Sequence, residues 1–374
     1  MEKNNVKEVL RKIDSGNYTP EEERIAKRWL FQLNNEKKLD FTEKQLNEAS
    51  AKMWAVVKKD LAPAGYQGSI KLWPGIAVAA MVLVFLGAGL LYFNYQTHNY
   101  SAIAQNDIEP GKPGGTLTLA DGKKIRLADM LNGKLVEQGG VTIRKAADGQ
   151  LVYELKGSGT GSHQINTIST ANAETYQVRL PDGTAVWLNA ASSLSYAPAL
   201  TEDGIRTVKL SGEAYFEVAK DKIHPFVVKT AGQEIQVLGT HFNVNAYANE
   251  PALVTTLLEG SVKVAAGSVK KLLKPGEQAV NTDGQIKVSE AIIDKALDWK
   301  NDEFYVNHIN FKTAMRKIAR WYNVEVIYNS SVPDDIEIGG WVSRNEKLSS
   351  VLHSMEAAGI VHFTIDGRKI YVSK

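Results

Sequence analysis

The sequence predicts a multidomain single-pass membrane protein, with an N-terminal α-helical bundle, one transmembrane helix, a mainly-β domain and a small C-terminal α+β domain. Three observations predict this organisation: a long apolar run without charges, helical periodicity before it, and Asp-Gly turns between short strand patterns after it. The 374 residues exceed one ordinary domain, and the formal net charge of +2 argues against a dedicated nucleic-acid binder. Because cysteine is absent, disulfides, thiolate metal sites and cysteine nucleophiles are excluded.

The apolar run predicts a transmembrane helix over residues 72–94. No Asp, Glu, Lys or Arg occurs between Leu72 and Asn106. A helix of about 20 residues spans the roughly 30 Å hydrocarbon core of a bilayer. Trp73 and Tyr92 stand near the two ends, where aromatic belts form. A buried core helix is the alternative, but apolar runs of this length are rare in soluble cores.

Lysines near the run predict its orientation. Only Lys112 follows the run closely, whereas four lysines precede it: Lys52, Lys58, Lys59 and Lys71. The positive-inside rule therefore places the N-terminus in the cytoplasm and the rest of the chain across the membrane. Because the run begins only at residue 72 and is longer than the core of a signal peptide, we expect an uncleaved anchor.

Residues 1–71 predict a cytoplasmic unit of three short helices. Capping boxes at residues 19–22 and 42–45 mark two helix starts, and apolar residues recur at helical spacing. A core this small leaves two interpretations open. The unit is either a self-contained bundle with Trp29 and Met53 in its core, or a docking module whose apolar faces are completed by a cytosolic partner.

Beyond the run, Asp-Gly pairs flanked by alternating apolar residues predict β-hairpins. They occur six times, at residues 121–122, 148–149, 182–183, 203–204, 283–284 and 366–367. Short strand patterns separated by turn signals fill residues 205–290, which is typical of a sandwich, a barrel or stacked sheets. We therefore expect a linker and first β-hairpins over 95–170 and a mainly-β domain over 171–297.

Residues 298–374 predict a small α+β domain in the order β-α-β-β-α-β-β. Two amphipathic patterns, at residues 311–322 and 348–355, predict its helices. Asp366-Gly367 turns the chain into a closing strand, Lys369–Val372. Only Ser373 and Lys374 follow that strand, so we expect it to form an exposed sheet edge.

No arrangement of reactive residues predicts an enzyme. The seven histidines are scattered without metal-ligand spacing, and neither a phosphate-binding loop nor a nucleophile elbow occurs, so we expect no metal and no cofactor. One dipeptide has covalent chemistry open to it: the Thr240 hydroxyl can attack the Gly239 carbonyl in an N-to-O acyl shift, and water then cleaves the ester. The simpler interpretation, which we favour, makes Gly239 a bulge or tight bend and Thr240 an ordinary strand residue.

Several blocks of the β region resemble the FecR family of membrane-bound anti-sigma factors and sigma regulators. The blocks follow one another in the family's order: LPDGT at 180–184, VWLN at 186–189, Ser193, Tyr196, VKLSGEAYFEV at 208–218, HPFVV at 224–228, VLGTHFNV at 237–244, LEGSV at 258–262 and KPGEQ at 274–278. Residues 298–374 are similar to the C-terminal domain of Bacteroidetes-type members. That domain resembles the short N-terminal domain of secretins and TonB-dependent receptors.

The resemblance implies a relay, with the chain in the lipid of the inner membrane and its C-terminal part in the periplasm. The signalling domain of an outer-membrane TonB-dependent transporter would bind the C-terminal domain. The N-terminal helices would then release or assist an extracytoplasmic-function sigma factor, without direct contact to nucleic acid. In this family, envelope proteases can take part in release, and some members cleave themselves at a Gly-Thr step, here Gly239-Thr240.

The relay implies two sets of contact residues. Sigma-factor contacts are expected on the apolar helical faces, at Ile25, Trp29, Leu33 and Met53. The transporter is expected to dock on the closing strand by strand addition or face to face, at Lys369, Ile370, Tyr371 and Val372. Two other classes are alternatives: a membrane-anchored periplasmic enzyme, which a convergent polar pocket would favour, and a structural envelope protein, which needs no cytosolic helices.

Overall fold

The computed structural model describes residues 107–129, 133, 135–138, 141–145, 151–155, 165–357 and 359–374. They belong to one of two compact units, Gly89–Lys374, and the other unit is Met1–Ala88. The predicted cytoplasmic helices, with Ile25, Trp29, Leu33 and Met53, and the predicted span over 72–94 lie outside the described residues. Within the described part, no helix is long and apolar enough to cross a membrane.

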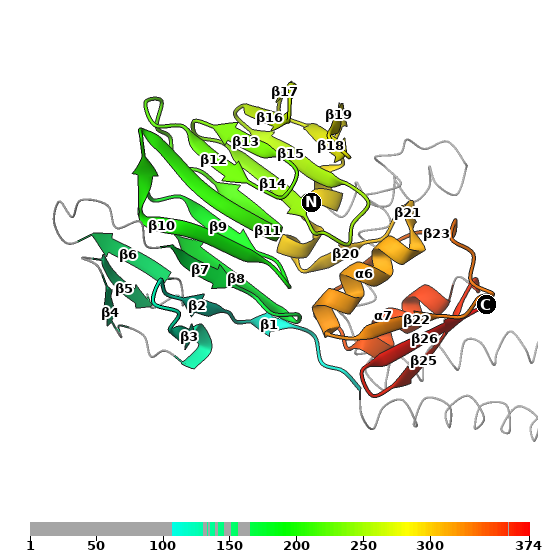
Figure 1. Cartoon of the computed structure of the whole chain (residues 1–374). Coiled ribbons are helices and arrows are strands. Elements are labelled where there is room, and N and C mark those ends of the chain that lie inside the picture. Colours follow the sequence, from blue (N-terminus) through cyan, green and yellow to red (C-terminus); the bar gives the residue numbers. More distant parts are fainter. Residues whose placement is uncertain are drawn as a thin grey trace, which may run out of the picture. The chain divides into compact units, whose positions relative to one another are not determined.

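Strands β1 to β19 form the β lobe, residues 112–290, in which two sheets share the long strand β11 (Figure 1). The first half of β11 pairs in one sheet and the second half in the other, on either side of Gly212. Gly212 has φ +89, and a side chain there would lie 2.7 Å from the Ser192 Cα, so glycine is required where the strand changes sheet.

The two sheets run through the following strands. The first contains, in order, β3 (Lys124–Arg126), β2 (Thr116–Thr118), β7 (Asn166–Ser169), β10 (Ser193–Glu202), β11 (Ile205–Glu217), β12 (Phe226–Lys229), β13 (Glu234–Val237), β16 (Val262–Ala266) and β17 (Val269–Leu273). The second contains β4 (Leu135–Gln138), β5 (Val141–Lys145), β6 (Leu151–Leu155), β8 (Glu174–Arg179), β9 (Ala185–Leu188), β11, β14 (His241–Ala246), β15 (Leu253–Glu259), β18 (Glu277–Thr282) and β19 (Gln285–Glu290). A short strand, β1 (Lys112–Pro113), pairs with β8.

One hydrophobic core serves both sheets. Phe216 and Phe242 stack at its centre with ring centroids 5.1 Å apart, and both are fully buried. Leu117 and Ile168 belong to the same core although they precede residue 171. The boundary predicted at residue 171 therefore falls inside one packed unit.

Five of the six Asp-Gly pairs join hairpin strands as predicted: β2–β3, β8–β9, β10–β11, β18–β19 and, in the C-terminal lobe, β25 (His362–Asp366) and β26 (Lys369–Ser373). At Asp203-Gly204 and Asp283-Gly284 both residues have positive φ, which a two-residue type I′ turn requires. The sixth pair, residues 148–149, lies outside the described residues.

The C-terminal lobe, residues 303–374, confirms the predicted helices and strands. A connecting segment with α5 (Ile293–Ala296) and the 3₁₀ helix η2 (Asp298–Asn301), which the sequence did not predict, leads into it. Its elements are β20 (Glu303–Tyr305), β21 (Ile309–Asn310), α6 (Phe311–Tyr322), β22 (Glu325–Tyr328), β23 (Glu337–Ile338), β24 (Trp341–Ser343), α7 (Leu348–Glu356), β25 and β26. Residues 336–342 hold two short strands, β23 and β24, because Gly339-Gly340 divides the segment and Gly340 has φ +116.

The predicted position of the closing strand in its sheet is wrong. β26 is the central strand of a three-stranded sheet, parallel to β22 on one side and antiparallel to β25 on the other. Its backbone groups are therefore committed on both sides. The edges of this sheet are β22 and β25, and strand addition at Lys369–Val372 is excluded.

Candidate functional site

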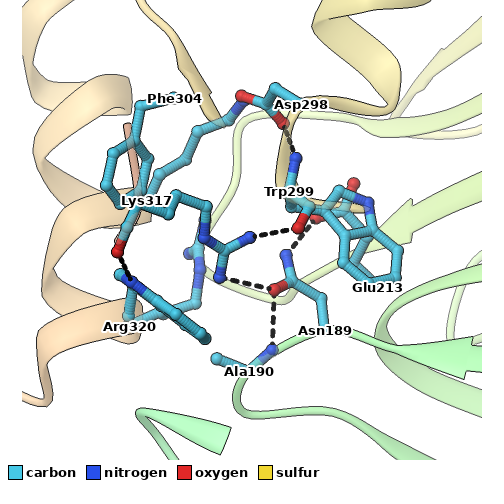
Figure 2. A pocket seen from close by; sticks show the side chains of 10 residues that line it. Asn189, Ala190, Glu213, Asp298, Trp299, Phe304, Lys317 and Arg320 are labelled. Carbon is cyan, nitrogen blue, oxygen red and sulfur yellow. Dashed lines mark hydrogen bonds and ion pairs between the residues drawn. The ribbon is translucent and has the colours of Figure 1, made fainter. Parts of the chain in front are cut away.

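Polar and aromatic side chains from both lobes converge where α6 faces the β lobe (Figure 2). The space between them is no larger than a water molecule needs. We call these residues the interlobe cluster: Asn189, Ala190, Glu213, Asp298, Trp299, Phe304, Lys317, Arg320, Trp321 and Arg344. They come from the β9–β10 turn, β11, η2, β20, α6 and the turn after β24.

Glu213 is the buried acid of the interlobe cluster. Its two carboxylate oxygens accept hydrogen bonds from the side-chain amides of Asn189 (2.9 Å) and Asn243 (3.0 Å). Burial raises the pKa of Glu213, although the positive charge of Lys317 and the two amide hydrogen bonds act in the opposite direction. The strand positions Glu213 through its own N–H, which donates to the Ser192 hydroxyl at 2.9 Å.

The two asparagines link Glu213 to the residues across the interface. Asn189 Oδ1 accepts from Arg344 Nη2 at 3.3 Å, and Asn243 Oδ1 accepts from the Trp299 indole N–H at 3.3 Å. Each amide thus presents its donor to Glu213 and its acceptor to the connecting segment or the C-terminal lobe. An amide flip would lose both bonds at once.

Arg344 is a buried cation held mainly by aromatic rings and carbonyl groups. Its guanidinium carbon lies 3.9 Å from the Trp321 ring centre and 5.5 Å from that of Phe304. Nη1 donates to the Trp299 carbonyl at 2.9 Å. Burial lowers the pKa of Arg344, while the nearby carboxylates of Asp298 and Glu213 raise it. The charge stabilises the interface through cation–π contacts and hydrogen bonds to neutral groups.

Asp298 fixes the start of the C-terminal lobe. Its carboxylate accepts from the backbone N–H groups of Trp299 (2.7 Å) and Tyr305 (3.0 Å) and from Lys317 Nζ (2.6 Å). The side chain is 2% exposed, so the ion pair with Lys317 lies in a poorly solvated site. Asp298 therefore ties η2, β20 and α6 together at the edge of the interlobe cluster.

A second group of ion pairs continues the interface beside the interlobe cluster. Glu250, in the turn between β14 and β15, accepts from Arg316 Nε at 2.9 Å and Nη2 at 2.6 Å, and from Arg320 Nη2 at 2.6 Å. Arg320 also lies 4.0 Å above the Tyr247 ring and donates to Asn249 Oδ1 at 3.2 Å. One turn of the β lobe thus holds two arginines of α6.

The arrangement can fix the orientation of the two lobes, and it offers no reaction centre. Apart from Arg344 Nε, which has no hydrogen-bond partner among the described residues, its side-chain donors and acceptors are paired within the protein, and the remaining space cannot admit a substrate larger than water. Among the described residues, no group of three or more His, Asp or Glu side chains is placed to hold a metal ion. The site is an electrostatic joint between two folded bodies.

Gly239 and Thr240 lie at the bend between β13 and β14. Gly239 has φ +151, and a side chain there would lie 2.7 Å from the Lys220 Cα. The Thr240 hydroxyl donates to the Ser261 carbonyl at 3.1 Å, and Thr240 is 2% exposed. This geometry agrees with the favoured interpretation of a tight bend followed by a strand residue.

The four candidate docking residues divide between the two faces of the sheet. Ile370 and Val372 are buried in the core of the C-terminal lobe and cannot contact a partner. Lys369 and Tyr371 point to the opposite face, where Tyr371 is 40% exposed. Only these two remain available, through their side chains.

The sequence predictions missed the interlobe cluster. Lys317 and Arg320 lie on a helix that was predicted from its apolar face alone, and Arg344 lies in a turn. One signal was present: Glu213 is an acid within a strand whose neighbours Ala214, Tyr215 and Phe216 are all apolar. A carboxylate in such a run predicts a buried partner, but not which residue supplies it.

Comparisons with known proteins cover both lobes. Residues 166–263 match the family model described as FecR protein, and residues 303–372 match the model described as FecR, C-terminal. Asn189, Glu213 and Asn243 fall in the first match and Lys317, Arg320 and Arg344 in the second.

Two solved structures resemble part of the chain. Both are crystal structures of a proposed anti-sigma factor from Parabacteroides distasonis, at 1.65 Å and 2.50 Å resolution. The first is 30% identical with a TM-score of 0.53, over 56% of this chain and 98% of that chain. The second is 31% identical with a TM-score of 0.53, over 56% of this chain and 99% of that chain. No protein among the curated ones matches the chain.

Proposed function

Since the chain belongs to the FecR family of anti-sigma factors, we propose that it relays a signal from an outer-membrane TonB-dependent transporter to a cytoplasmic extracytoplasmic-function sigma factor. The coarser function, regulation of a sigma factor, follows from the family and from the related crystal structures. The two ends of the relay and its path through the inner membrane are the proposal.

The interlobe cluster is the observation that supports a relay. An enzyme would need a pocket that admits substrate, whereas the polar side chains here are largely buried and most of them are paired within the protein. A receiving lobe that is joined firmly to a second lobe passes on a displacement instead of absorbing it. Coupling of this kind needs packed elements and hydrogen-bond networks that continue across the interface.

The receiving surface in this proposal is the exposed face of the sheet β22-β26-β25. Tyr371 lies at its centre, paired with Ile327 of β22 and Thr364 of β25 in the sheet register. Lys369 lies on the same face between Glu325 and Asp366. An exposed tyrosine with charged side chains beside it is a common centre for a protein interface. The transporter's signalling domain would dock face to face here.

The cytoplasmic end of the proposal rests on the sequence. The apolar faces with Ile25, Trp29, Leu33 and Met53 would bind the sigma factor, and residues 72–94 would cross the lipid of the inner membrane. Envelope proteases would act on the chain during release. Because the chain has no cysteine, single cysteines can report the topology. A membrane-impermeant maleimide should label Ser289→Cys from the periplasm and Ser15→Cys only after lysis.

Deleting the chain and measuring transcripts in its native host tests the proposed function. We expect a defined set of promoters that share one sigma-factor recognition sequence to change several-fold. Expression of the chain from a plasmid should restore the original levels. A structural envelope protein would give a general stress response without a shared promoter sequence, and that result would contradict the proposal.

A further inference from the structure

The first described residues of the chain lie on the C-terminal lobe, although in sequence they lead into the β lobe (Figure 1). We call residues 107–111 the strap. Ile108 is buried in the core of the C-terminal lobe. The Ile108 carbonyl accepts from the Leu348 N–H at 3.0 Å. Asp107 Oδ1 accepts from the Ser349 N–H at 3.1 Å, and Oδ2 accepts from the Ser349 hydroxyl at 2.5 Å.

The strap caps α7, which lacks a cap of its own. The residue at the N-cap position, Lys347, makes no side-chain hydrogen bond to the helix. The first N–H groups of a helix have no partner within it, and a carboxylate at that end is also favoured by the helix dipole. Asp107 and Ile108 therefore supply, from a distant part of the chain, the hydrogen-bond acceptors that a Ser or Asp at the N-cap position usually supplies.

The other end of the strap is fixed to the β lobe and to the interlobe cluster. Gly111 packs so closely on Trp321 that a side chain there would lie 2.6 Å from the indole ring. The next residue, Lys112, donates its N–H to the Ala173 carbonyl at 2.9 Å, and β1 then pairs with β8. The strap thus runs from the start of α7, past the ring on which Arg344 stacks, into the β lobe.

We propose that the strap is a releasable latch, through which the C-terminal lobe controls the chain segment between the predicted span and the β lobe. The inference rests on the proposed function for its biological meaning. A partner that shifts α7 breaks the hydrogen bonds that the Leu348 and Ser349 N–H groups donate to the strap, and this frees residues 107–111. Beyond the contacts of Asp107, Ile108 and Gly111 little holds the strap, because Glu109 is exposed and its pair with Lys347 lies at the surface. Release therefore removes one side chain, Ile108, from the core of the C-terminal lobe and leaves the core of the β lobe intact.

Hydrogen exchange of the full-length protein in detergent tests the latch physically. Asp107→Ala should speed exchange about five-fold or more at residues 107–111 and in the first turn of α7, and leave α6 unchanged. Asn310→Ala is the matched control, because it removes the cap of α6. In the wild type, Asn310 Oδ1 accepts a hydrogen bond from the Thr313 N–H at 3.3 Å. That variant should loosen the first turn of α6 and leave the strap unchanged. If Asp107→Ala loosens α6 equally, the strap is only part of the fold and the proposal is wrong.

Transcript levels test the latch in cells by rescue. Asp107→Cys alone should move the sigma-dependent transcripts several-fold toward the pattern of the deletion strain. Adding Ser349→Cys should restore the wild-type pattern, because a disulfide between the two introduced cysteines, formed in the oxidising periplasm, would hold the strap on α7. The side chains at these two positions are in contact, and the chain has no other cysteine to compete. Unchanged transcripts in the single variant, or no rescue in the double variant, would overturn the latch. If the deletion itself changes no transcripts, the proposed function fails, and the exchange result is unaffected.

Discussion

Glu250 of the β lobe and Arg320 of the C-terminal lobe form a buried ion pair, with 2.6 Å between Oε1 and Nη2 and side chains 7% and 10% exposed. Arg316 Nη2 donates to the other carboxylate oxygen of Glu250, Oε2, at 2.6 Å. Both charges have left bulk water, so each depends on the other for its solvation. The two lobes are therefore held at this point by groups that cannot separate without being rehydrated together.

Replacing Glu250 with Ala should uncouple the lobes. The change leaves two arginines without their carboxylate, and removing one partner of a buried pair costs about 3 kcal/mol or more. We expect urea unfolding of residues 107–374 to split from one transition into two, one for each lobe. Lys229→Gln is the control, since its pair with Glu234 is more than half exposed and contributes little. A single transition with an unchanged midpoint in Glu250→Ala would contradict the electrostatic joint.

Glu213 should make the protein less stable as the pH rises. Burial raises the pKa of Glu213 above its ordinary value of 4.5, so the unfolded chain loses this proton at a lower pH than the folded one. The contribution of Glu213 to stability is then greatest below about pH 4.5 and declines as the pH rises through the folded-state pKa. The free energy of unfolding of the wild type should fall relative to Glu213→Gln between pH 4 and 8. If the free energy of unfolding of the wild type instead rises relative to that of Glu213→Gln over this range, the carboxylate is stabilised in its ionised form.

Substitutions at Tyr371 and Ile370 should separate an effect on docking from an effect on folding. Ile370→Ala removes a fully buried side chain and should cost the C-terminal lobe about 2–5 kcal/mol. Tyr371→Ala, on the exposed face, should cost less than about 1 kcal/mol and still abolish binding to the transporter's signalling domain. Circular dichroism and a titration of that domain measure the two effects. Wild-type affinity in a folded Tyr371→Ala variant would exclude this face as the docking site.

The bend at Gly239 should be structural. Gly239→Ala introduces a side chain against the Lys220 backbone, whereas Gly267→Ala, also at positive φ, meets nothing within 4 Å. The first should therefore destabilise the β lobe by at least about 1 kcal/mol more than the second. The purified chain should have its full mass. Two fragments that join at residues 239 and 240, and that disappear in Thr240→Val, would instead establish the self-cleavage interpretation.

Local signals predicted much of the described fold. Asp-Gly pairs marked five hairpins, because in each turn the glycine adopts a positive φ that other residues rarely adopt. The faces of α6 and α7 followed from helical spacing, since both helices bury one side against a sheet. The resemblance to the FecR family is confirmed by the family models and the solved structures.

Long-range pairings were not predictable from the same signals. The edge assignment of β26 failed because chain order says nothing of sheet order, and β22 returns to pair beside the last strand. The interlobe cluster joins Glu213 to groups more than a hundred residues away, and the strap joins Asp107 to Ser349 across 242 residues. Single polar residues carry no periodicity, so their partners appear only when the sheets and helices are assembled.

Capture of a sigma factor by the full-length chain tests the central claim most directly. The chain would be cross-linked in its native host, purified in detergent and its partners identified by mass spectrometry. The account predicts one extracytoplasmic-function sigma factor with the wild type, its loss with Trp29→Asp, and its retention with Trp29→Phe, which keeps an apolar ring. Wild-type chain that captures no sigma factor, or Trp29→Asp chain that captures it equally well, would contradict the account.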